Sequence, residues 1–238
     1  MELKFLGRGS AFNPKEGNTS AYFMDDKQLF LIDSGESVFE RLVANGLLED
    51  ITDINLMITH THSDHIGSLG TLVMYSYYVL GRPLNIVIPS EAKYLSNIEE
   101  ILNGFGCSHE MYNYVDEKKY DNKFLSFQTI RYMETKHSDE LSCYGILFTT
   151  LDGLIYYSGD TREIENVKLV INTGKNIDKL YIDTTTANFL GNVHLYIGVL
   201  QEQIPEELKS KVYCMHLNND LCIEEARIRG FNVVEVLQ

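Results

Sequence analysis

The amino-acid sequence predicts an α/β protein in which two sheets stack face to face and helices cover the outside. Short apolar runs typical of strands recur in both halves of the chain, and helical patterns follow the strands in each half. The chain has 238 residues, which is enough to bury a substantial core. Its composition, 44% hydrophobic and 23% charged, is that of an ordinary globular protein. We therefore expect a single domain over residues 1–238.

The first half opens with strands and then alternates strands with helices. Its expected strands are residues 2–6, 19–24, 28–32, 54–58 and 84–88, and its expected helices are residues 37–44, 63–80 and 90–102. Asp25 to Lys27 join two of the strands in a predicted hairpin. Apolar residues spaced three and four apart from Ile66 to Leu80 indicate the second helix, for which Ser63 is a suitable N-cap.

The second half repeats this alternation. Its expected strands are residues 124–133, 145–150, 154–158, 179–182, 212–215 and 231–236, and its expected helices are residues 161–169 and 222–229. Residues 103–123 connect the halves and lose the periodicity, although they are rich in aromatic side chains. Two interpretations fit this segment: a surface hairpin that covers a helix edge, or a lid or dimer arm that offers aromatic faces to a nucleobase.

The charge balance limits the class of partner. The chain has 34 acidic and 20 basic residues, so its formal net charge is −14. Binding of long nucleic acids normally relies on several Lys and Arg contacts to phosphates, and we therefore consider such a partner unlikely. A small, singly charged nucleotide is repelled far less.

The sequence also suggests a location. The four cysteines lie far apart without a CxxC pair, which favours reduced, buried thiols. No apolar run approaches the length of a membrane span, and Met1 to Lys4 open into a strand-like run instead of a signal peptide. We expect a cytoplasmic protein without a membrane segment, in the host cytoplasm if the chain is viral.

The strongest chemical signal is a cluster of metal-binding residue types in one short stretch. His60, His62, Asp64 and His65 lie within six positions, between a predicted buried strand and a predicted helix. In an extended stretch His60 and His62 point the same way and can hold one ion. Asp64 and His65, turned by the incoming helix, can reach a second ion. The motif therefore predicts a site for two ions.

Three further residues stand where predicted strands end. His137, Asp160 and His216 each follow a strand of the second half. Loops at strand ends are where sites are usually assembled on a sheet scaffold. We expect these side chains to complete the ligand set.

Several segments resemble the tRNase Z-like branch of the metallo-β-lactamase superfamily. They are Phe5 to Phe12, Asn18 to Ser20, Leu31 to Gly35, the His60 to His65 motif and Ser158 to Arg162. The resemblance covers essentially the whole chain and implies an αββα sandwich of two mixed sheets flanked by helices. In pattern and length the chain is also similar to phage anti-Pycsar proteins, which form homodimers and degrade cyclic nucleotide immune signals.

The resemblance also implies a role for each candidate residue. One zinc ion would be held by His60, His62 and His137, and the other by Asp64, His65 and His216, with Asp160 as a bridge; manganese is a possible replacement. Asp33 would orient a ligand histidine. His194 would protonate the leaving oxygen, although the family's usual glutamate is missing near Asp183, so the carboxylate partner of His194 stays open. His109 is left over as a structural or lid residue.

These features predict a metal-dependent phosphodiesterase in which Asp64 and His194 are essential for activity. The preferred substrate is a small 3′,5′-cyclic nucleotide, converted to the 5′-monophosphate by a homodimeric protein. One alternative is trimming of tRNA 3′ ends, which the net charge and the lack of a basic or Gly-Pro-rich arm disfavour. A lactonase-like hydrolase and a non-catalytic nucleotide binder are further alternatives.

Overall fold

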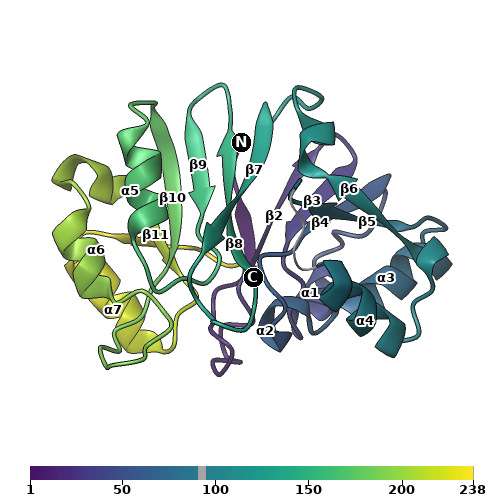
Figure 1. The fold of residues 1–238 in the computed structure, drawn as a ribbon, viewed down its shortest axis with the longest axis horizontal. Helices are drawn as coiled ribbons and strands as arrows, with labels where there is room; N and C mark the ends of the chain where they lie inside the picture. Colours follow the sequence, from purple (N-terminus) through teal and green to yellow (C-terminus); the bar gives the residue numbers. More distant parts are fainter. Residues whose placement is uncertain (91–94, 238) are drawn as a thin grey trace.

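The computed structural model of the protein has two six-stranded sheets packed face to face, with helices on the outer face of each sheet (Figure 1). The structure describes residues 1–90 and 95–237. This arrangement confirms the predicted αββα sandwich of two mixed sheets.

The two sheets share one pattern of strand pairing. The first sheet contains β1 (Lys4–Gly7), β2 (Ser20–Asp25), β3 (Gln28–Ile32), β4 (Asp53–Met57), β5 (Leu84–Ile88) and β6 (Tyr112–Asp116), in that spatial order. The second contains β7 (Thr129–Thr135), β8 (Cys143–Thr149), β9 (Leu154–Tyr157), β10 (Ile177–Asp183), β11 (Val212–Met215) and β12 (Asn232–Val233). In each sheet the first three strands pair antiparallel and the later ones pair parallel.

Helices cover the outer faces. The α-helices are α1 (Val38–Ala44), α2 (Ser63–Ile66), α3 (Leu69–Tyr78), α4 (Leu95–Gly104), α5 (Glu165–Asn172), α6 (Ile197–Gln203) and α7 (Asp220–Ile228), and the 3₁₀ helices are η1 (His109–Met111), η2 (Glu117–Tyr120) and η3 (Glu206–Lys211). The first-half helices lie on the first sheet, and α5, α6 and α7 lie on the second (Figure 1). None of the helices within residues 1–90 and 95–237 combines the length and apolar character needed to cross a membrane.

Strand β3 shows why the central strands read as continuous apolar runs. Leu29 and Leu31 belong to the core cluster under the helices, whereas Phe30 belongs to the cluster between the sheets. There the Phe30 ring stacks on Phe23 at 4.8 Å between centroids. Because successive side chains point to opposite faces and both faces are covered, every position of the strand favours an apolar residue.

The helix predicted over residues 63–80 is in fact two helices. α2 ends at Ile66 and α3 begins at Leu69, and His62, not Ser63, is the N-cap residue of α2. Between the helices, Ser68 donates its backbone N–H and its hydroxyl to the carbonyl oxygen of Ser34, at 2.9 and 3.0 Å. These two hydrogen bonds fix α2 beside Ser34, which directly follows Asp33.

Residues 103–123 do not form the predicted surface hairpin. They contain the end of α4, η1, the edge strand β6 and η2. Tyr112 and Tyr120 are buried, and the Tyr120 hydroxyl donates to Asn55 Oδ1 at 2.7 Å. The core occupies the faces of these two rings, so they are not available to a nucleobase. A role of residues 103–123 as a lid or dimer arm stays a prediction.

Other boundaries also differ from the sequence prediction. β7 begins at Thr129 and not at residue 124, because Phe124 and Phe127 stack on each other at 5.2 Å in a loop that fills the core between the sheets. The helix expected from residue 161 begins at Glu165, since the preceding residues turn at the site. The strand expected over residues 231–236 is reduced to β12 and one bridge from Val236 to Phe5.

Two further helices, α6 and η3, were not predicted from the sequence. The expected helix start at residues 90–91 falls partly outside the described residues, and α4 is described from Leu95.

Candidate metal centre

All seven predicted metal ligands lie together at one edge of the sandwich. His60 and His62 follow β4, and Asp64 and His65 lie on α2. The other three follow strands of the second sheet: His137 after β7, Asp160 after β9 and His216 after β11. The site is therefore built between the two sheets from residues that are distant in the sequence.

The first group consists of three imidazoles. His60 Nε2 lies 2.9 Å from His62 Nδ1, which in turn lies 3.2 Å from His137 Nε2. Burial, followed by the charge of His65, holds the pKa of His60 well below its ordinary value, which keeps its imidazole neutral. Neutral imidazoles whose nitrogens converge on one point are the ligands that a divalent transition-metal ion requires.

The second group combines two imidazoles with a carboxylate. Asp64 Oδ2 lies 3.2 Å from His216 Nε2 and 3.4 Å from His65 Nε2. His65 Nε2 is fully buried and has no hydrogen-bond partner. A buried nitrogen without a partner is costly. When His65 is neutral, with its proton on Nδ1 toward Asp33, a bound cation would satisfy the lone pair of Nε2. The donor set therefore fits a second ion.

Asp160 lies between the two groups. Its Oδ2 atom is 3.4 Å from the Nε2 atoms of both His65 and His216. The same oxygen is 3.6 Å from His137 Nε2 and 3.9 Å from His60 Nε2. Burial alone would raise the pKa of Asp160, but His216 and His65 outweigh it and hold the pKa well below its ordinary value. One ionised oxygen thus faces both groups, the position expected of a bridging ligand.

Asp33 orients His65 through a contact with Nδ1, the ring nitrogen that faces away from the site. Its Oδ2 atom lies 2.9 Å from His65 Nδ1, so Nε2 is the nitrogen that faces the site. The carboxylate also accepts hydrogen bonds from the backbone N–H and the hydroxyl of Thr59, both at 2.8 Å. Asp33 and His216 adopt left-handed backbone conformations, with φ of 61° and 59°. Such strain in non-glycine residues is typical of functional sites.

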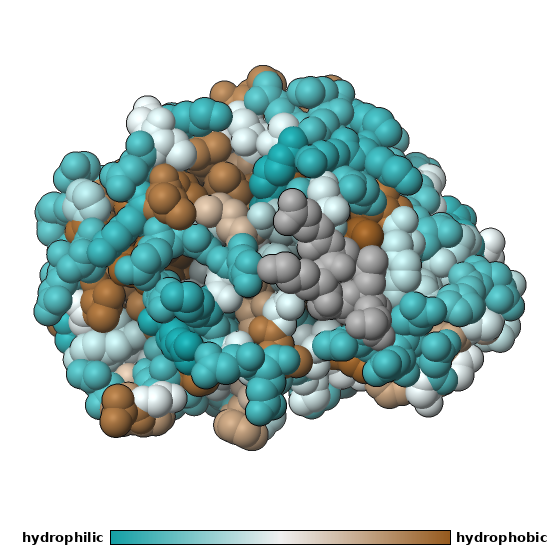
Figure 2. All heavy atoms as spheres, viewed as in Figure 1, coloured by the Kyte–Doolittle hydropathy of each residue, from teal (hydrophilic) through white to brown (hydrophobic). Residues whose placement is uncertain are grey.

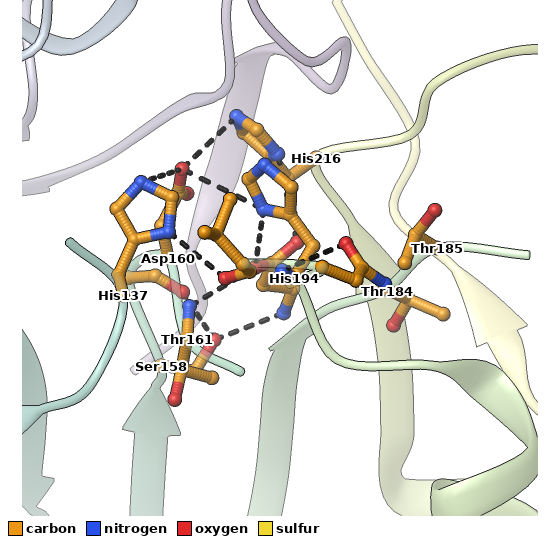
Figure 3. A network of polar contacts seen from close by, with 12 residues as sticks. His137, Ser158, Asp160, Thr161, Thr184, Thr185, His194 and His216 are labelled. Atoms are coloured by element: carbon orange, nitrogen blue, oxygen red, sulfur yellow. Dashed lines mark hydrogen bonds and ion pairs between the residues drawn. The ribbon is translucent and has the colours of Figure 1, made fainter. Parts of the chain in front are cut away.

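His194 lies beside both ligand groups. Its ring centroid is 5.0 Å from that of His137 and 4.8 Å from that of His216, and the three side chains meet around Asp160 (Figure 3). The side chain is 19% exposed, so it can contact a bound molecule. The carbonyl of its neighbour Val193 lies 2.9 Å from His137 Nδ1, which fixes that ligand as well.

Asp183 is the carboxylate partner of His194, and the sequence argument did not identify it. Asp183 Oδ2 lies 2.8 Å from His194 Nδ1, and Asp183 Oδ1 lies 3.5 Å from His216 Nδ1. Burial alone would lower the pKa of His194, but the charge of Asp183 and its hydrogen bond outweigh it and raise the pKa. Asp183 ends β10, so the strand-end criterion that selected the other ligands could have found it.

His109 is not part of the site. It lies in η1, where its side chain is 69% exposed and faces Glu99 at 3.5 Å. Its Nδ1 atom is 3.3 Å from the Tyr112 hydroxyl. The role of His109 as a structural or lid residue stays a prediction.

Comparisons with known proteins show relatives in sequence and in fold. A protein of Bacillus phage 010DV004 called anti-Pycsar protein Apyc1 is 30% identical over 249 residues, which cover 93% of this chain and 90% of that protein. Two solved structures share the fold. The metallo-β-lactamase fold protein YhfI from Bacillus subtilis has a TM-score of 0.73 at 18% identity and covers 99% of this chain and 96% of its own. Human tRNase Z, short form, has a TM-score of 0.67 at 17% identity, with 100% and 98% covered.

A match to a protein-family model identifies the family of the chain. The model described as anti-Pycsar protein Apyc1 matches residues 1–235, nearly the whole sequence. The chain therefore has the metallo-β-lactamase fold and belongs to the anti-Pycsar Apyc1 family.

Proposed function

We propose that this protein is a phosphodiesterase that uses two divalent metal ions to hydrolyse 3′,5′-cyclic nucleotides to 5′-monophosphates, and that it removes cyclic nucleotide immune signals during phage infection. The observation that carries the proposal is the position of Asp160 Oδ2 within 3.9 Å of ligand nitrogens from both groups. Five imidazoles and two carboxylates suit zinc, and manganese is an alternative. Membership of the anti-Pycsar Apyc1 family supports the choice of substrate.

Two ions bound there would supply positive charge for a phosphate oxygen and lower the pKa of a water molecule. The protein's own groups then supply position and protons. His194 faces the space beside both ligand groups, and its hydrogen bond to Asp183 holds Nδ1 so that Nε2 is directed outward. A protonated His194 can donate its Nε2 proton to the departing 3′ oxygen. Without this proton the oxygen would depart as an alkoxide, which is a poor leaving group.

The charge of the molecule supports a small substrate. The net charge of −14 opposes a long polyanion, and hydrophilic side chains dominate the face seen in Figure 2. A cyclic nucleotide carries one negative charge, so a pair of bound cations can outweigh this repulsion locally. A precursor tRNA carries many negative charges, so two cations at one site would not offset its repulsion.

Product analysis tests the proposal directly. Protein loaded with zinc or manganese is incubated separately with cCMP, cUMP, cAMP, cGMP and a precursor tRNA, and the products are separated by chromatography. We expect 5′-monophosphates from at least one cyclic nucleotide and no trimmed tRNA. Trimming of the tRNA without turnover of any cyclic nucleotide would contradict the proposal and favour a tRNase Z-type activity.

A further inference from the structure

Two turns beside the site display apolar side chains to solvent. Phe12 is 96% exposed at the tip of the loop between β1 and β2, which lies on the same side of the molecule as α2 (Figure 1). Leu190 is fully exposed and Phe189 is 63% exposed in the segment that leads to His194. Large apolar side chains in water forgo the free energy of burial, and those beside a site are available to contact a bound ligand.

The turn that carries Phe12 is anchored next to a metal ligand. The backbone N–H of Asn13 donates to Ser10 O at 3.0 Å, which places Ala11 and Phe12 at the centre of a β-turn. The N–H of Ser10 and the side-chain amide of Asn13 both donate to the carbonyl of Leu217, at 3.1 and 2.9 Å. Leu217 directly follows His216. Phe12 is therefore held on a fixed support and not on a loose loop.

The second turn has the same construction. The N–H of Asn192 donates to Phe189 O at 3.2 Å, so Leu190 and Gly191 form the tip. The Asn192 side chain donates to Ala187 O at 2.8 Å and accepts the backbone N–H of His194 at 3.2 Å. Asn13 thus ties its turn to the residue after His216, and Asn192 ties its turn to the backbone of His194.

The backbone segments that support the two turns lie close together. The rings of His194 and His216 stack with centroids 4.8 Å apart, and each histidine adjoins the support of one turn. We infer that Phe12 and the Phe189–Leu190 pair grip the base of the substrate, while its phosphate lies at the metal centre. The inference rests on the proposed function, because a cyclic nucleotide has one large apolar part, its base.

Energetics favour this assignment. Because the protein as a whole is strongly negative, attraction of the substrate phosphate depends on the bound ions and on a protonated His194. Apolar contact with a base adds affinity without charge and tolerates different bases, since every base has a flat apolar face. Tyr112 and Tyr120 cannot take this role because they are buried.

The test compares two substrates in matched variants. Phe12→Ala and Leu190→Ala are assayed with a cyclic nucleotide and with methyl p-nitrophenyl phosphate, a phosphodiester without a base. Leu151→Ala is the control, because Leu151 is 82% exposed but precedes β9, at the end of the strand away from Asp160. We expect the KM for the cyclic nucleotide to rise about tenfold in each site variant. Turnover of the base-free ester, the melting temperature and the control should remain unchanged.

Three results would overturn the inference. One is an unchanged KM for the cyclic nucleotide in both site variants, and another is an equal loss for both substrates. The third is a change of oligomeric state in Phe12→Ala by light scattering, which would assign the turns to a contact between copies of the chain. No turnover of any cyclic nucleotide by the unsubstituted protein would instead overturn the proposed function, and the inference with it.

Discussion

His194 and Asp183 form the pair of residues on which the proposed proton transfer depends. Asp183 is fully buried, so one carboxylate orients the proton donor His194 through a hydrogen bond and also lies beside the metal ligand His216. It also accepts the backbone N–H of Thr161 at 3.0 Å, next to Asp160. A single side chain therefore connects three parts of the site.

Substitution of His194 tests its role as a proton donor. His194→Ala should lower kcat for a cyclic nucleotide by about 10²- to 10⁴-fold, because the 3′ alkoxide is a poor leaving group. Hydrolysis of methyl p-nitrophenyl phosphate releases methyl phosphate and a stable p-nitrophenolate, which needs no proton to depart, so turnover of this ester should fall little. Steady-state kinetics of both substrates provides the measurement. An equal fall for both would show that His194 acts through its neighbours, for example through the contact between Val193 O and His137.

At the scale of elements, η2 closes the exposed edge of the second sheet. Glu117 in η2 is buried, and its Oε2 atom accepts the backbone N–H of Tyr132 in β7 at 2.8 Å. Burial raises the pKa of Glu117, and the hydrogen bond from Tyr132 and the charge of Arg131 offset this only in part. The folded protein therefore holds the Glu117 proton more tightly than the unfolded chain does.

This pKa difference predicts a pH-dependent stability. A raised pKa in the folded state stabilises the fold below the ordinary glutamate pKa, and that contribution is lost as the pH rises through the folded-state value. Glu117→Gln keeps an oxygen for the Tyr132 N–H but carries no charge. We expect a melting temperature higher by about 2–4 °C at pH 7, for a gain on the order of 1 kcal/mol.

Thermal unfolding at several pH values checks this expectation. The difference between Glu117→Gln and the unsubstituted protein should shrink toward pH 4, where the glutamate is protonated in both states. A difference that is the same at pH 4 and pH 7 would assign the effect to packing and not to the charge.

The sequence did not predict β6, and the reason is physical. β6 contains two tyrosines and an asparagine, and the amide of Asn113 continues a row of side-chain hydrogen bonds from Asn55 through Asn85. In the sequence such a strand resembles a polar loop. Pairing with the neighbouring strand β5, and not an alternation of apolar residues, determines its extended conformation. Phe124 and Phe127 show the opposite case, since apolar residues fill the core from a loop.

At the scale of the whole molecule, the sandwich brings together strand ends from both halves of the chain. The sequence was sufficient for the fold class and for all seven candidate ligands, because metal chemistry restricts the residue types and strand ends restrict their places. It did not identify Asp183 as the partner of His194, since only the folded chain shows which carboxylate reaches which ring. The apolar turns at Phe12 and Leu190 were also not recognised, because exposure cannot be read from residue type.

Metal content is the most direct test of the central claim, a site for two ions with Asp160 between them. The protein is saturated with zinc, dialysed and analysed by mass spectrometry for bound metal. We predict about two ions per chain in the unsubstituted protein. Asp160→Ala should retain fewer than one, and Asp183→Asn, which leaves every proposed ligand in place, should retain both. A single ion in an active unsubstituted protein, or an unchanged content in Asp160→Ala, would contradict the claim.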